Sequence, residues 1–240
     1  MSPNELAKGY SINVGNKTIR VEPGAKNNML AVLSEKGNFA PKLKVLNDYS
    51  KLMCKGFCCF KKAGEIWFDP KADNILIQQN GKLCISDFID KTITNSHVTN
   101  AHEAKFIREG IIETPEDRKK AEQITFRAGA ITLLESIEAM EGGSHFLENS
   151  PMDGLVLIEQ TRVNLRNSIN RYKQNSKAGD VEKNLIFHLE TALWMLKDAE
   201  PPDSNFPSDA PPASPEELYR RLKGSDIDDL RNIDIPHLNK

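Results

Sequence analysis

The chain has 240 residues, of which 39% are hydrophobic and 28% charged, enough for one compact domain of average size. Its net charge of -2 gives no electrostatic indication of binding to nucleic acid or to an anionic membrane. No apolar run reaches transmembrane length, and the N-terminus lacks the basic and apolar parts of a secretory signal peptide. We therefore expect a soluble cytoplasmic protein with no nucleic-acid partner and no membrane span.

The first 42 residues predict a small β portion. Three short segments read as strands, over residues 10–14, 17–21 and 29–33. Gly15 and Asn16 form a hairpin turn signal between the first two strands. At most a small sheet fits into this length.

A long helix is predicted next, over residues 43–64. Its apolar residues fall on one face, at positions 45, 46, 49, 52, 53, 57 and 60. Gly64 suits the C-terminal cap, and Lys61 and Lys62 stand where the helix dipole favours cations.

A β-hairpin follows this helix. Residues 75–77 and 83–85 are short apolar runs on either side of Gln79-Asn80-Gly81, which is a good turn sequence. Polar residues stand at the two open ends of the hairpin, Asn74 before the first strand and Asp87 after the second. Two residues far apart in sequence are thereby expected to meet in space. Leu76, Ile85 and Phe88 are expected to be buried, together with Leu133 and Leu134 further along the chain.

The rest of the chain predicts helices and one Pro-rich loop. Residues 124–140 form a strongly apolar helix, which indicates enclosure on several sides, and amphipathic helices are expected over 155–172, 181–196 and 215–222. Residues 200–215 are rich in Pro, Ser and Asp and favour extended, solvated backbone. Residues 224–240 are expected to form a tail.

Residues 67–88 carry a resemblance to a known family. Asp69, Lys71 and Asn74 precede the hairpin at fixed offsets, and an Asp-Phe pair at Asp87 follows it. This order resembles the catalytic loop and metal-binding segment of the protein kinases. The resemblance implies that Asp69 accepts a proton from a hydroxyl nucleophile and Lys71 neutralises charge on the migrating phosphoryl group. It implies that Asn74 and Asp87 bind Mg²⁺ or Mn²⁺ together with ATP.

The resemblance also implies a fold. Residues 43–223 are similar to the mainly helical C-terminal lobe of a kinase, with residues 124–140 as its central helix and Thr114-Pro115-Glu116 as the end of an activation segment. The fold class is then α+β, kinase-like, with a much reduced β N-terminal portion over 1–42. The two glycines beside the first strand, Gly9 and Gly15, are open to two interpretations, an ordinary hairpin or a reduced phosphate lid.

The chain departs from the kinase pattern at several positions. Trp67 stands where the loop usually opens with His, Ile89 replaces the Gly after Asp-Phe, and Ile124 replaces the Asp that usually anchors the loop. No lysine of the N-terminal portion is assigned to clamp the nucleotide. Trp67 is expected to pack as apolar support beneath the loop.

The cysteines and histidines form no readable catalytic pair. Cys54, Cys58, Cys59 and Cys84 fall on predicted apolar faces, so we expect buried thiols in a reducing compartment rather than a metal pair at Cys54 and Cys58. His188 stands between apolar neighbours on a predicted helix and is expected to be a partly buried structural residue.

Three functions remain open at this stage. The first is ATP- and Mg²⁺-dependent transfer of phosphate to a protein hydroxyl by a minimal Ser/Thr-type kinase. This resembles the abbreviated kinase-type effectors that bacteria secrete into a host cytosol, whose partner would be a host protein. The second is a pseudokinase that acts as a protein-binding scaffold, and the third is a truncated product of a longer kinase gene.

Overall fold

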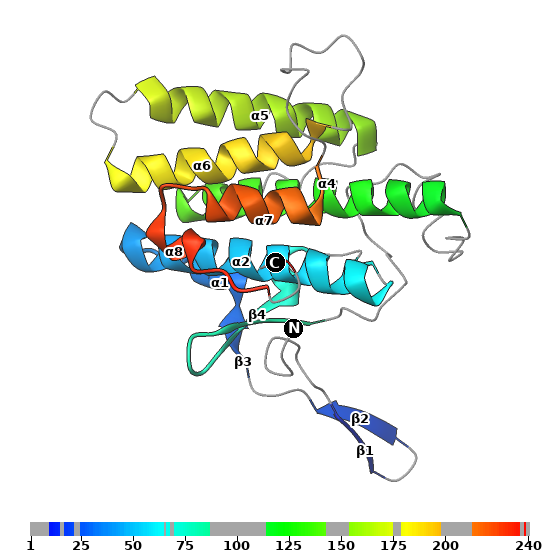
Figure 1. The fold of residues 1–240 in the computed structure, drawn as a ribbon. Coiled ribbons are helices and arrows are strands. Elements are labelled where there is room, and N and C mark those ends of the chain that lie inside the picture. The colour runs from blue at the N-terminus through cyan, green and yellow to red at the C-terminus, as the bar shows by residue number, and fades with distance from the viewer. Residues whose placement is uncertain are drawn as a thin grey trace.

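Helix α2 (Phe39–Ala63) is the central element of the fold, and many of the other described elements pack against it. The fold is that of a computed structural model, which describes residues 10–14, 17–21, 25–64, 66–67, 70–86, 114–142, 154–174, 179–197, 213–235 and 238. These residues are mainly helical with a small antiparallel sheet, which confirms the expected α+β class. Figure 1 shows α2 (blue to cyan) between the sheet strands and the remaining long helices.

The boundaries of α2 follow from its caps. At the N-terminus the Asn38 side chain accepts a hydrogen bond from the Ala40 amide (3.0 Å). At the C-terminus Gly64 adopts φ 75°, a left-handed conformation that glycine takes without steric cost, and its N–H bonds back to the carbonyls of Phe60 and Lys61. The predicted apolar face is confirmed, with Leu46, Tyr49, Leu52, Met53 and Phe57 buried and Val45 and Phe60 partly buried.

The predicted hairpin is present. Strands β4 (Ile75–Gln78) and β5 (Leu83–Ile85) pair antiparallel, with Ile75 opposite Ile85 and Ile77 opposite Leu83. The Gly81 amide donates to the Gln78 carbonyl (2.9 Å) and closes the turn. The 3-10 turn η1 (Ala72–Asn74) leads into β4.

The predicted strand over residues 29–33 is wrong, because these residues form helix α1 (Met29–Ser34). Asn28 caps this helix by accepting a hydrogen bond from the Ala31 amide (2.8 Å), and Met29 and Leu33, one helical turn apart, are both completely buried. The strand lies just before the helix, as β3 (Ala25–Asn28), and pairs antiparallel with β4. The sheet order is therefore β3-β4-β5.

The first two predicted strands are confirmed. Strands β1 (Tyr10–Val14) and β2 (Lys17–Val21) pair antiparallel and form a two-stranded sheet of their own. Gly9 and Gly15, whose role was left open, lie outside the described residues.

The predicted C-terminal helices are all present (Figure 1), as α4 (Pro115–Met140), α5 (Gly154–Gln174), α6 (Asp180–Met195) and α7 (Pro215–Lys223), followed by the short α8 (Asp228–Arg231). Helix α4 begins nine residues earlier than expected, so Pro115 and Glu116 lie in its first turn rather than in a separate segment. Pro is well suited to a first helical position because its missing N–H would be unpaired there anyway. Leu133 and Leu134 on α4 are completely buried, and α6 contacts α2, α4 and α5.

The two strands of the hairpin differ in how they bury the residues predicted for the core. Ile85 is completely buried as predicted, whereas Leu76 is only half-buried. Side chains alternate between the two faces of a strand, so Ile75 and Ile77 occupy the core face of β4 and Leu76 the other. Phe88, which was expected in the same core, lies outside the described residues.

The cysteines match the expectation of mostly buried thiols. Cys54, Cys58 and Cys84 are buried, Cys59 is half-buried, and none of the four forms a disulfide. Burial raises the pKa of the Cys54 thiol well above its ordinary value. In the part of the chain that the structure describes, no helix has the length and apolar character needed to cross a membrane.

A buried polar network joins α6 to α2. The His188 side chain is completely buried, beyond the partial burial expected from sequence. Its Nε2 donates to Asn47 Oδ1 (2.7 Å), and its Nδ1 accepts from the Ser50 hydroxyl (3.1 Å). Both nitrogens of a neutral ring are thus satisfied. Burial lowers the pKa of His188 from 6.5 to about 3.

We predict that the free energy of unfolding decreases as the pH falls below 6.5. Below pH 6.5 the unfolded chain binds a proton on His188, whereas the folded chain does not. The stability that the neutral His188 contributes is therefore fully present above the pKa of the unfolded state, 6.5, and is lost as the pH falls toward the pKa of the folded state, about 3. Between pH 7 and pH 5.5, His188 alone should remove about 1 kcal/mol. Urea unfolding at both pH values measures the loss. The variant His188→Gln should lack it, and an equal pH dependence in that variant would assign it to other groups.

Candidate functional site

Two of the four predicted site residues lie in the described part of the chain. Lys71 and Asn74 are described, whereas Asp69 and Asp87 lie outside the described residues. The structure shows the contacts that fix the described residues next to positions 69 and 87.

On the N-terminal side of the loop, Trp67 packs against α2. Its side chain is 1% exposed, and its ring lies 5.7 Å from the ring of Phe57 and 6.2 Å from that of Phe60, measured between centroids. The ring rests on Gly56, where a Cβ atom would lie 2.8 Å from the ring atoms Cε3 and Cζ3. Only a glycine at this position allows so close an approach. The expected apolar support role of Trp67 is confirmed.

On the C-terminal side of the loop, a buried hydrogen bond fixes the backbone. The Tyr49 hydroxyl, completely buried on α2, donates to the Pro70 carbonyl (2.8 Å). Trp67 and Pro70 flank positions 68 and 69, so both sides of the predicted proton acceptor are anchored to the same helix. Two contacts about two turns apart on α2 thus fix the chain on both sides of positions 68 and 69.

Asn74 closes the open end of the hairpin. Asn74 is 7% exposed, and its backbone N–H donates a hydrogen bond to the backbone carbonyl of Lys71 (3.1 Å) within η1. The backbone carbonyl of Asn74 accepts two hydrogen bonds from Ser86, one from its backbone N–H (2.8 Å) and one from its hydroxyl (3.0 Å). Ser86 is the residue before Asp87 in the chain. The structure thus brings Ser86 against Asn74, whereas the predicted meeting of Asn74 with Asp87 lies outside the described residues and stays a prediction.

Lys71 precedes η1 in an extended conformation (φ -75°, ψ 155°) and is half-buried. The neighbouring acid, Asp73, is exposed and accepts a long hydrogen bond from the Asn28 side chain (3.4 Å). Since Asn28 also caps α1, the N-terminal portion of the chain contacts the loop directly. This contact was not foreseen from the sequence.

The residue types at the hairpin end fit a magnesium ion. An amide oxygen from Asn74 and a carboxylate from Asp87 are oxygen donors, which Mg²⁺ prefers. Among the described residues, no group of three or more His, Cys, Asp or Glu side chains could hold a metal. This finding does not bear on a site built on Asn74 and Asp87, because Asn is not one of those residue types and Asp87 lies outside the described residues. A shared ion at these two residues therefore stays a prediction.

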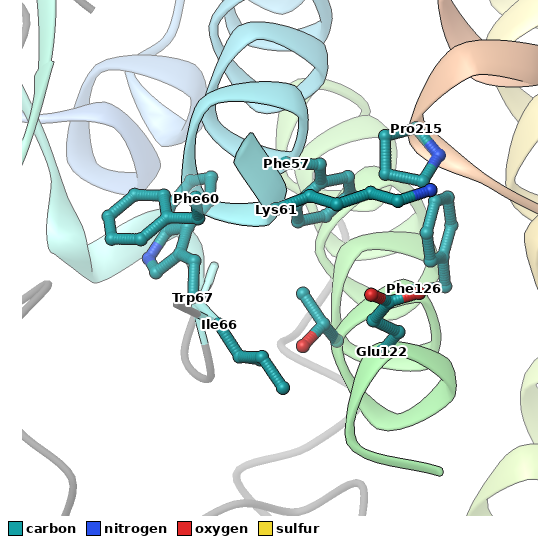
Figure 2. Close-up of a pocket in the computed structure, with 9 residues that line it drawn as sticks. Phe57, Phe60, Lys61, Ile66, Trp67, Glu122, Phe126 and Pro215 are labelled. Carbon is teal, nitrogen blue, oxygen red and sulfur yellow. The ribbon is translucent and has the colours of Figure 1, made fainter. Parts of the chain in front are cut away.

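A small aromatic cavity lies beside the loop, where α2 ends. Figure 2 shows Phe60 and Trp67 on one side and Phe126 and Pro215 on the other, with Lys61 extending toward Pro215. The cavity holds about 20 Å³, enough for about one water molecule and far too little for a nucleotide. It is a packing gap beneath the loop rather than a binding site.

Two anchoring residues were missed at the sequence level. Tyr49 was assigned only to the apolar face of its helix, and Gly56 was assigned no role. Both carried a signal. A Tyr hydroxyl on a buried face needs a hydrogen-bond partner, and a Gly inside a helix costs about 0.5–1 kcal/mol relative to Ala and so indicates close packing.

The chain was compared with known proteins. Neither the protein-family models nor the curated proteins gave a match. The functional interpretation accordingly depends on the residues and geometry described above.

We predict that Gly56→Ala destabilises the fold by about 1–3 kcal/mol, because the added Cβ overlaps the Trp67 ring. At an open helix position the same change normally stabilises by roughly 0.5–1 kcal/mol. In a Trp67→Leu background the opposing ring is absent, so Gly56→Ala should be neutral or stabilising there. Urea unfolding of all four proteins closes the cycle. Equal effects of Gly56→Ala in both backgrounds would show that the two residues are not in contact.

Proposed function

We propose that the chain is a kinase-like phosphotransferase that moves a phosphoryl group from ATP to a hydroxyl group of a protein, with a fold related to the kinase C-terminal lobe. The observation that carries the proposal is the double hydrogen bond from Ser86 to Asn74 at the open end of the β4–β5 hairpin. It brings Ser86, the residue before Asp87, against Asn74, and a metal site shared by Asn74 and Asp87 requires the chain to pass there. The order of α2, loop, hairpin and α4 supports the same interpretation.

Each residue has a separate task in this mechanism. Asp69 accepts the proton of the attacking hydroxyl, which raises the nucleophilicity of its oxygen. Lys71 places a positive charge near the phosphoryl oxygens, where negative charge gathers during transfer. Asn74 and Asp87 would hold Mg²⁺, whose chemistry is to neutralise charge on the phosphates of ATP.

The anchoring of the loop supplies the positional precision that such a reaction needs. Most of the catalysis in phosphoryl transfer comes from orientation and electrostatics, so a loop that shifts by 1 Å loses much of its effect. Trp67 on Gly56 and Tyr49 on Pro70 hold the chain on both sides of position 69.

A protein-binding scaffold is the second candidate. Trp67 occupies the position where kinases usually carry His, and it is buried against the rings of Phe57 and Phe60. A buried aromatic residue at this position stabilises the fold, and a protein without catalytic activity would need this stabilisation as well. As with the first candidate, the partner would be a protein, and delivery into a host cytosol remains part of the proposal.

Transfer from radiolabelled ATP to a generic protein acceptor, or to the chain itself, distinguishes the two candidates. We predict activity with Mg²⁺ or Mn²⁺ that falls by about 10²–10⁴-fold in Asp69→Asn and at least as far in Asp87→Asn. Asp73→Asn is the matched control, since it makes the same change at an exposed acid of the same loop, and it should retain activity.

Two outcomes would contradict the proposal. No transfer by folded wild-type protein with either metal would favour the scaffold. Transfer that neither Asp69→Asn nor Asp87→Asn reduces would come from a contaminating kinase.

A further inference from the structure

A groove of about 630 Å³ lies between α2 and the tip of the β4–β5 hairpin. It is at the opposite end of the hairpin from Asn74, so it is separate from the site described above. Its lining combines charged, polar and apolar side chains. The lining residues used below are Lys44, Val45, Asp48, Lys51, Leu52, Lys55, Lys82 and Leu83.

The groove is basic. Its lining contains four lysines, Lys44, Lys51, Lys55 and Lys82, and one acid, Asp48. Burial alone would raise the pKa of Asp48, but hydrogen bonds from Lys44 and Lys51 outweigh it and the pKa is lowered. Asp48 is thus charged at neutral pH and contacts both lysines at 2.7 Å. The negative charge of Asp229 makes a smaller contribution to the raised pKa of Lys44. The four lysines of the groove outnumber Asp48 and Asp229.

The lysines form a line rather than a point. Steps of seven and four residues return a helix to the same face, so Lys44, Lys51 and Lys55 follow one stripe of α2. At about 1.5 Å per residue they span about 16 Å, which is the length of about five residues of extended polypeptide. Lys82 stands on the opposite wall, at the exposed hairpin tip.

The base of the groove is apolar. Leu52 and Leu83 are 5% and 7% exposed, and Val45 is partly buried beside them. The side chain of Lys44 is 68% exposed and that of Lys51 21%, so the charges border this apolar strip. Such a surface suits an extended ligand that presents negative charges and apolar groups on the same face.

We propose that this groove binds an extended acidic segment of a partner protein, with Glu or Asp side chains at the lysines and apolar side chains on the strip between them. A single phosphate fits less well, because the charges are spread over about 16 Å and because lysines offer point charges rather than the bidentate fork of arginine. The inference does not depend on catalysis, since an enzyme and a scaffold would both use such a surface.

Fluorescence anisotropy with a labelled octapeptide of Glu and Leu in alternating pairs (Glu-Glu-Leu-Leu, repeated once), which presents both residue types on each face of an extended chain, tests the proposal. We expect binding that weakens as salt is raised, because screening reduces the attraction between charges. Lys82→Glu should weaken binding by about fivefold or more, since it converts one attractive pair into a repulsive one. Lys62→Glu is the matched control. It lies on the exposed last turn of α2, outside the groove, and should change the affinity less than twofold.

Circular dichroism first establishes that both variants are folded. A Lys-Leu octapeptide should not bind. The proposal is overturned if the Glu-Leu octapeptide fails to bind at millimolar concentration, or if Lys62→Glu weakens binding as much as Lys82→Glu. It is also overturned if a single-stranded oligonucleotide of equal charge binds more tightly than the acidic peptide.

Discussion

The contact between Trp67 and Gly56 is the constraint on which the candidate site depends. The ring lies so close to α2 that no side chain fits at position 56, and the Tyr49 hydroxyl holds the backbone at Pro70 two turns away. Between these two contacts the chain has only to span positions 68 and 69. The two described residues that flank these positions, Trp67 and Pro70, are therefore both held by a helix that belongs to the core.

The same helix serves the rest of the fold on its other faces. His188 on α6 hydrogen bonds to Asn47 and Ser50, and its neutral ring carries polar contacts into a region closed to water. At the end of α2, Cys58 donates to the Pro215 carbonyl (3.5 Å) and Lys61 pairs with Glu216 (2.9 Å), which fixes the start of α7. The exposed stripe of α2 forms one wall of the basic groove. A change in α2 is thus expected to affect loop, core and groove together.

The regular elements were largely predictable from the sequence, since their signals are local. The hairpin followed from two apolar runs around Asn80 and Gly81, and α2 from its apolar spacing and its terminal Gly64. The helix at Met29–Ser34 was mistaken for a strand because a short apolar run fits either structure, and the cap from Asn28 decides between them. The anchoring contacts could not be derived, because they join residues 11 and 21 positions apart whose proximity depends on the fold.

If the loop binds a metal–nucleotide complex, ATP and the metal ion together should raise the free energy of unfolding of the protein. Unfolding is followed in urea with ATP, with Mg²⁺, and with both, for wild type, Asp69→Asn and Asp87→Asn. A ligand at 100 times its dissociation constant adds about 2.7 kcal/mol to the free energy of unfolding. The account predicts stabilisation of wild type that requires ATP and Mg²⁺ together, persists in Asp69→Asn and is lost in Asp87→Asn. Wild-type protein that gains no stability from millimolar ATP with either Mg²⁺ or Mn²⁺ would contradict it.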